Sequence, residues 1–129
     1  MLYEELTSKI IGAFYTVYNT LGHGFLEKVY ENALAIELRK QGMKAEQQRR
    51  IDAFYDGQRV GEYFADIVVD GCVVLELKAA EVIAAEHEAQ LINYLKATEM
   101  EVGLLLNFGL KPQFVRKILT NDRKSIHHG

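Results

Sequence analysis

The chain has 129 residues, of which 49% are hydrophobic and 26% charged, and its formal net charge is −3. This composition is typical of one globular domain rather than a disordered segment, and its negative charge argues against strong nonspecific binding to nucleic acid. No apolar run reaches the ~20 residues that span a bilayer, and the N-terminus opens with acidic residues, so we expect a cytoplasmic protein without membrane contact. The only cysteine, Cys72, excludes an internal disulfide and cannot supply the several thiolates of a structural zinc or iron–sulfur site.

Helical spacing of apolar residues predicts two helices in the first third of the chain. The first covers residues 2–21 and stops at Gly22. The second lies within residues 25–42 and ends at Gly42. Its predicted buried face consists of Leu26, Val29, Tyr30, Ala33, Leu34 and Leu38.

The pattern then changes to that of strands. Residues 43–55, 58–69 and 72–79 are rich in β-branched and aromatic residues, and Asp56-Gly57 and Asp70-Gly71 separate them as hairpin turns would. Residues 84–98 return to helical spacing, residues 101–108 resemble a fully buried strand, and residues 114–119 form either an edge strand or a short helix after Pro112. The expected order is α-α-β-β-β-α-β with one further short element.

This order predicts an α/β fold, because a strand reached through a helical crossover pairs in parallel with a neighbour. We therefore expect a mixed sheet flanked by helices. Residues 1–120 are expected to form a single domain and residues 121–129 a flexible tail.

Three charged residues interrupt the second and third predicted strands: Asp66, Glu76 and Lys78. Glu76 and Lys78 share a face because side chains alternate along a strand. A two-residue Asp70-Gly71 loop would leave Asp66 on the opposite face. A three-residue loop of residues 69–71 with a bulge would pair Asp66 with Val74 and bring the charges together, and we predict this second arrangement because an isolated buried carboxylate is costly.

Convergent carboxylates beside a lysine suit metal-dependent phosphodiester cleavage. Oxygen ligands from Asp66 and Glu76 could hold Mg²⁺, while Lys78 could orient the attacking water or stabilise the transition state. The alternative is a water-facing salt bridge between Glu76 and Lys78, which would contribute little. The apolar residues around the pair argue against that alternative.

The segment Gly24-Phe-Leu-Glu27-Lys-Val-Tyr30 matches the GxxExxY signature, and by this motif the chain resembles the GxxExxY family of small proteins in the PD-(D/E)xK nuclease superfamily. The likeness extends from the first helix through the strand at 101–108. It implies a restriction-endonuclease-like core, with Glu27, Asp66 and Glu76 as ligands of Mg²⁺ or Mn²⁺ and Lys78 as the catalytic lysine. Gln90 and Tyr94 match the QxxxY element of RecB-type relatives, which implies that they bind the substrate phosphate or brace the lysine. The usual proline before the aspartate is replaced by Ala65.

The resemblance implies a metal-dependent nuclease that binds DNA or a structured nucleic acid weakly. Arg49, Arg50 and Arg59 of the first hairpin are candidate phosphate contacts, as are Lys111, Arg116 and Lys117. A catalytically silent binding or assembly subunit, such as a homodimer, is the main alternative. Hydrolysis of a small nucleotide is a third.

Overall fold

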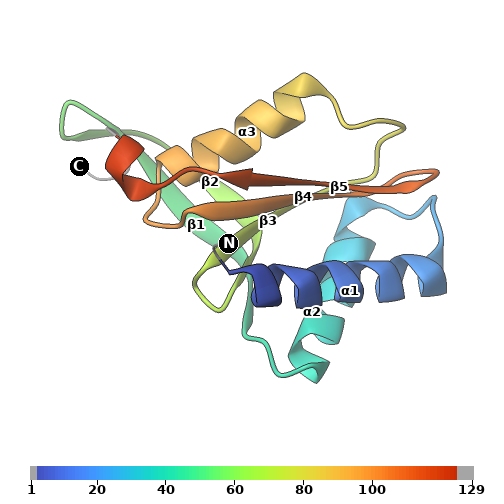
Figure 1. Ribbon diagram of the computed structural model, residues 1–129. Helices are drawn as coiled ribbons and strands as arrows, with labels where there is room; N and C mark the ends of the chain where they lie inside the picture. The colour runs from blue at the N-terminus through green and yellow to red at the C-terminus, as the bar shows by residue number, and fades with distance from the viewer. Residues whose placement is uncertain (1–2, 125–129) are drawn as a thin grey trace.

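The computed structural model describes residues 3–124, and these fold into a five-stranded sheet covered by helices on both faces (Figure 1). No helix of this described chain has both the length and the hydropathy to cross a membrane. The elements, in sequence, are α1 (Glu4–Leu21), α2 (Glu27–Lys40), β1 (Ala45–Tyr55), β2 (Gln58–Val69), β3 (Val73–Lys78), α3 (Ala85–Lys96), β4 (Val102–Phe108), β5 (Pro112–Ile118) and a 3₁₀ turn (Asn121–Arg123).

The strands lie in the sheet in the order β1-β2-β3-β4-β5. The β3–β4 pair is parallel and the other three pairs are antiparallel. The α3 crossover makes the parallel pair possible, because a tight turn can join only antiparallel neighbours. The predicted mixed sheet and α/β fold are confirmed, and the last element is an edge strand.

Each face of the sheet has its own hydrophobic core. Figure 1 shows α1 and α2 on one side and α3 on the other. On the first side Phe14 and Tyr30 both pack on the ring of Phe108, with ring centroids 4.8 and 4.3 Å away. On the other side Leu91 and Leu95 of α3 belong to a core that covers alternate residues of the same strands.

The buried face of α2 differs from the sequence expectation. Leu26 precedes the helix and is 79% exposed, and Val29 is also exposed. Tyr30, Leu34 and Leu38 are buried as predicted, and they are joined by Ala35 and one acid, Glu31. The helix is therefore turned so that Glu31, rather than Val29, faces the sheet.

The β2–β3 turn also differs in detail. Val69 pairs with Val73, so the loop is Asp70-Gly71-Cys72 rather than residues 69–71. Asp70 and Gly71 have φ values of 52° and 66°, and the Asp70 side chain accepts a hydrogen bond from the Lys44 amide. Val74 consequently lies opposite Val68, and the predicted pairing of Asp66 with Val74 is wrong by two residues. Asp66 nevertheless lies close to Glu76, because the observed register continued by one step places the two residues opposite each other.

Residues just beyond β5 pack against the α3–β4 connection. The Asn121 amide donates to Glu101, and the Lys124 ammonium donates to the carbonyls of Thr98 and Met100. Structure thus continues to residue 124, beyond the predicted start of the tail at 121. The remainder of that predicted tail, 125–129, lies outside the described residues.

Candidate metal and nuclease site

Asp66 and Glu76 come together where β2 and β3 part. The last paired residues are Ile67 and Leu75, and continuing this register by one step places Asp66 opposite Glu76. Instead of a further ladder bond, the Leu77 amide donates to Asp66 Oδ2 at 2.8 Å. The Asp66 carboxylate is thereby held against the β3 backbone, one residue from Glu76.

Glu76 is a buried carboxylate in the middle of the sheet. It lies on β3 opposite Leu105 of β4 and is only 5% exposed. Burial raises its pKa to about 8, and the nearby negative charge of Asp66 acts in the same direction. Burial likewise raises the pKa of Asp66, while the Leu77 hydrogen bond opposes that shift. Two carboxylates with raised pKa values in one place are typical of a functional site.

Lys78 and Tyr94 border this carboxylate pair. The Lys78 ammonium lies 3.8 Å from Glu76 Oε1, and its positive charge lowers the pKa of Glu76. Tyr94, on α3, hydrogen-bonds to the Glu76 carboxylate, which also lowers that pKa, and burial raises the pKa of Tyr94 itself. Gln90 donates to the Tyr94 hydroxyl at 3.1 Å, so the tyrosine accepts from the amide and can direct its own proton toward Glu76.

Glu27 approaches the same region from the other face of the sheet. It occupies the first turn of α2, and its Oε2 accepts a long hydrogen bond of 3.3 Å from the Ala79 amide at the end of β3. Its negative charge raises the pKa of both Asp66 and Glu76. The structure thus brings Glu27 to the carboxyl end of β3, beside the Glu-x-Lys segment.

Two observations bear on whether these residues could bind a cation: the number of ligands that converge, and the buried oxygens that lack a hydrogen-bond donor. Within residues 3–124, no three or more His, Cys, Asp or Glu side chains converge as the ligands of one ion do. However, Glu76 Oε2 is buried and has no hydrogen-bond partner in that part of the chain. A buried oxygen without a donor, beside a second carboxylate that repels it, is the environment that a hard divalent cation relieves. Asp66 and Glu76 are therefore the residues whose chemistry could suit Mg²⁺ or Mn²⁺.

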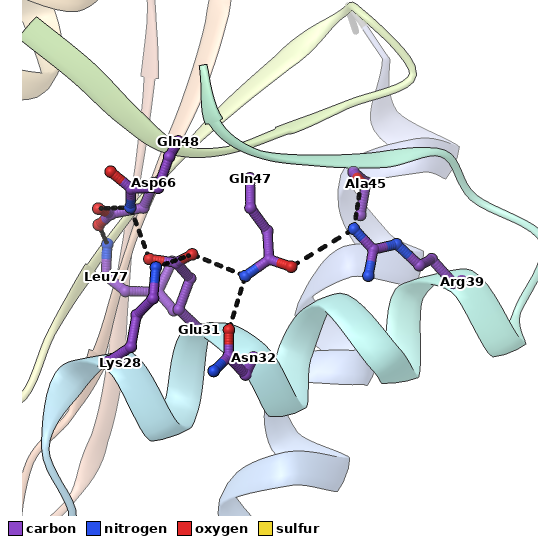
Figure 2. A network of polar contacts seen from close by, with 9 residues as sticks. All are labelled: Lys28, Glu31, Asn32, Arg39, Ala45, Gln47, Gln48, Asp66 and Leu77. Carbon is purple, nitrogen blue, oxygen red and sulfur yellow. Dashed lines mark hydrogen bonds and ion pairs between the residues drawn. The ribbon is translucent and has the colours of Figure 1, made fainter. Parts of the chain in front are cut away.

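Sequence reasoning missed two polar residues next to Asp66. The buried Glu31 of α2 and Gln48 of β1 hydrogen-bond to one another, and Gln48 also reaches Asp66 (Figure 2). In the sequence, an acid one residue after Tyr30 is indistinguishable from the solvated face of a helix. A glutamine within a polar strand carries no signal of its own.

Asn107 was also missed, and it shapes the segment after Lys78. Its side-chain amide accepts from the Ala80 N–H and donates to the Ala80 carbonyl, both at 2.9 Å, and the residue is fully buried. This pair of bonds extends the parallel ladder one step past the Lys78–Asn107 pairing. Gly109 permits the close approach, since a Cβ there would lie 2.1 Å from the Ala80 carbonyl oxygen.

The basic residues expected to contact phosphate are largely engaged elsewhere. Arg50 and Arg59 form ion pairs with Asp52 and Glu62 along the β1–β2 hairpin, and Arg49 lies 3.8 Å from Glu46. Lys117 forms a 2.7 Å ion pair with Glu88. The hairpin thus presents balanced charge rather than a positive track.

Comparison with known proteins agrees with this fold. A family model described as the PD-(D/E)XK nuclease superfamily matches residues 4–118. No functionally curated protein matches the sequence. The chain is similar to the solved structure titled "Crystal structure of SSO0001", with a TM-score of 0.61 and 17% sequence identity over 94% of this chain. The alignment spans 62% of the length of that protein, so the likeness concerns the shared fold.

Proposed function

Since the chain belongs to the PD-(D/E)XK nuclease superfamily, we propose that it is a Mg²⁺- or Mn²⁺-dependent cytoplasmic nuclease that hydrolyses phosphodiester bonds in DNA or a structured nucleic acid. The observation that supports this proposal is the proximity of Asp66 to Glu76 where β2 and β3 part, with Lys78 on the same strand as Glu76. The GxxExxY motif of residues 24–30 favours the family of that name within the superfamily.

In this proposal Asp66 and Glu76 hold the cation, and Glu27 completes the set from the helix side. When bound, the cation supplies Lewis-acid polarisation and offsets negative charge on the scissile phosphate. Both strand acids would be ionised with the cation present, because a nearby positive charge favours the charged carboxylate and offsets the desolvation that raises their pKa values.

Lys78 has two tasks that follow from its position. Its ammonium lies close enough to Glu76 to exchange that contact for a phosphate oxygen or an attacking water. A positive charge located where negative charge develops stabilises a transition state more than the ground state. Gln90 and Tyr94 lie on the α3 side of the carboxylates and serve in this proposal as donors to the substrate phosphate.

The test is cleavage by the purified chain with Mg²⁺ or Mn²⁺ on single-stranded, duplex and branched DNA and on structured RNA. Asp66→Asn should reduce the cleavage rate by at least about 100-fold, because loss of one ligand charge removes the basis for holding the ion. The matched control is Asp56→Asn at the tip of the β1–β2 turn. Asp56 has φ 53°, which asparagine tolerates, so this variant should cut like the parent.

Cleavage that persists in Asp66→Asn would assign the activity to a contaminant. Metal binding supplies a second readout. Free Mg²⁺ or Mn²⁺ at about 100 times its Kd should raise the free energy of unfolding of the parent by about 2.7 kcal/mol and should leave that of Asp66→Asn unchanged.

A catalytically silent nuclease-fold subunit is the second candidate. The ion-paired hairpin arginines favour it, because they leave little free positive charge for nucleic acid. A parent protein that folds, neither cuts nor binds Mn²⁺, and forms a stable complex with a copy of itself or a partner would select this alternative.

A further inference from the structure

Glu31 is a buried acid that the proposed reaction does not use. It is 4% exposed, and three side chains donate to it. Lys28 and Gln47 donate to Oε2 at 3.1 and 2.7 Å, and Gln48 donates to Oε1 at 2.7 Å. Figure 2 shows these donors converging on Glu31 from the first turns of α2 and from β1. A buried carboxylate with this many donors stays fixed in position.

Gln48 adopts a backbone conformation unusual for a strand. Its φ is 53°, in the left-handed region that non-glycine residues other than Asn and Asp seldom occupy. The consequence is visible in its neighbour: consecutive side chains of a regular strand point to opposite faces, yet Gln47 and Gln48 both bond to Glu31. Beyond this point β1 changes sides, because Ala45 belongs to the α1–α2 core and Ile51 to the α3 core.

This conformation directs the Gln48 amide to the space between two carboxylates. The same Nε2 that donates to Glu31 also lies 3.5 Å from Asp66 Oδ1. Asp66 thus receives a donor on each oxygen, Gln48 on Oδ1 and the Leu77 amide on Oδ2. A neutral donor orients the carboxylate and leaves its charge intact, whereas a lysine in the same place would cancel that charge. Strained backbone retained beside an acidic cluster is typical of functional positioning.

We propose that Gln48 is a positioning residue: anchored by the buried carboxylate of Glu31, its side-chain amide fixes the orientation in which Asp66 receives the divalent cation. The inference rests on the proposed metal site, but its first consequence, a fixed Asp66 carboxylate, exists without metal. Outer donors to ligating carboxylates commonly change metal affinity by about 10–100-fold.

Gln48→Gly isolates the side chain, because glycine adopts the left-handed conformation without strain. Gln47→Ala is the matched control: it removes an equally short hydrogen bond to Glu31 from the adjacent residue but no contact with Asp66. If Gln48→Gly folds poorly, Gln48→Asn provides a second variant, because asparagine has a shorter side chain and also tolerates positive φ.

Two measurements on the full chain follow. In EDTA, hydrogen exchange of the Leu77 amide should quicken by about 5–10-fold in Gln48→Gly, because the Asp66 oxygen that accepts from it is released, and should stay within about twofold in Gln47→Ala. Mn²⁺ titration followed by electron paramagnetic resonance should show about 10-fold weaker binding in Gln48→Gly and parental binding in Gln47→Ala.

Leu77 exchange in Gln48→Gly that matches the parent, or equal acceleration in Gln47→Ala, would overturn the positioning role. So would parental Mn²⁺ affinity in Gln48→Gly. If the parent itself binds no Mn²⁺, the proposed function fails, while the metal-free exchange still decides whether Gln48 orients Asp66.

Discussion

Asp66 and Glu76 show how far individual residues can be assigned from sequence. Their acidity within apolar strands led us to expect a shared site, and in the structure the two carboxylates lie close to each other. The pairing had to be inferred from loop geometry, and the inferred partner of Asp66 was two residues away from the observed one. In a regular strand an even shift keeps a residue on the same face, so the proximity of the two acids was predictable although the register was not.

The raised pKa of Glu76 predicts how metal-free stability changes with pH. In the folded chain Glu76 holds its proton to about pH 8, whereas in the unfolded chain it loses it near the ordinary value of 4.5. Between these values the folded state binds more protons, so the free energy of unfolding falls as pH rises. The stabilisation is complete below about pH 4.5, is lost progressively as pH rises from there to about 8, and is absent above that pH.

Glu76→Gln removes this titration, because the amide stays neutral. In EDTA we expect the melting temperature of Glu76→Gln to lie close to that of the parent near pH 5 and to exceed it by at least about 5 °C at about pH 8.5. Thermal melts followed by circular dichroism at both pH values measure the difference. A gap that is the same at both pH values would show that Glu76 titrates normally in the folded chain.

The burial of Glu31 and the backbone conformation of Gln48 could not be predicted from the sequence. Apolar periodicity assigned Leu26 and Val29 to the buried face of α2, and both are exposed while Glu31 is buried. The partners that make this burial tolerable lie on another element, at Gln47 and Gln48, and no local pattern reports them. The sequence does not predict the left-handed backbone conformation of Gln48 either, because glutamine is not a residue associated with positive φ.

At the scale of the elements, two hydrogen bonds between the Asn107 side chain of β4 and the backbone of Ala80 form a clip. This clip holds the end of β3 that carries Glu76 and Lys78. Asn107→Ala removes both hydrogen bonds to Ala80, and we expect the free energy of unfolding to fall by about 1–3 kcal/mol. Urea denaturation measures this loss. Asn93→Ala, on the exposed side of α3, is the control and should leave stability within about 0.5 kcal/mol. Equal effects of the two substitutions would contradict a special role for the Asn107 amide.

Gly109 tests the same clip from the steric side. A methyl group there would lie 2.1 Å from the Ala80 carbonyl oxygen, so the two backbones must separate in Gly109→Ala. We expect a destabilisation of about 2 kcal/mol or more in urea, typical of forced overpacking. Gly61→Ala is the matched substitution, since its added methyl group would meet no atom within 4 Å and its φ is not positive. That variant should be as stable as the parent, and a similar loss in both would refute the steric explanation.

The order and type of the elements were predictable because their signals are local. Helical and alternating periodicities identified both helices before the sheet, the first hairpin and the α3 crossover, and the Asp56-Gly57 turn joins Tyr55 to Gln58 as a two-residue loop. The second turn has the same Asp-Gly signal but includes Cys72 as a third residue. Strand pairing in the whole sheet fixes that extra residue, and the dipeptide itself does not.

For the molecule as a whole, the single sheet joins the two cores, so we expect one cooperative unfolding transition. Leu34 on α2 and Leu91 on α3 are both fully buried but lie in different cores. Leu34→Ala and Leu91→Ala should each lower the free energy of unfolding by about 2–5 kcal/mol. Far-ultraviolet and tyrosine near-ultraviolet circular dichroism should shift together in both variants. Transitions that separate would show that the two layers unfold independently.

The strands occupy the sheet in the order in which they leave the ribosome, but the helices that cover its first face are synthesised before any of them. The rings of Phe14 and Tyr30 can pack on the ring of Phe108 only after β4 has been synthesised. During most of translation α1 and α2 therefore expose the faces that later become the core. A nascent chain paused before β4 should for this reason be the species most dependent on chaperones and most prone to aggregate.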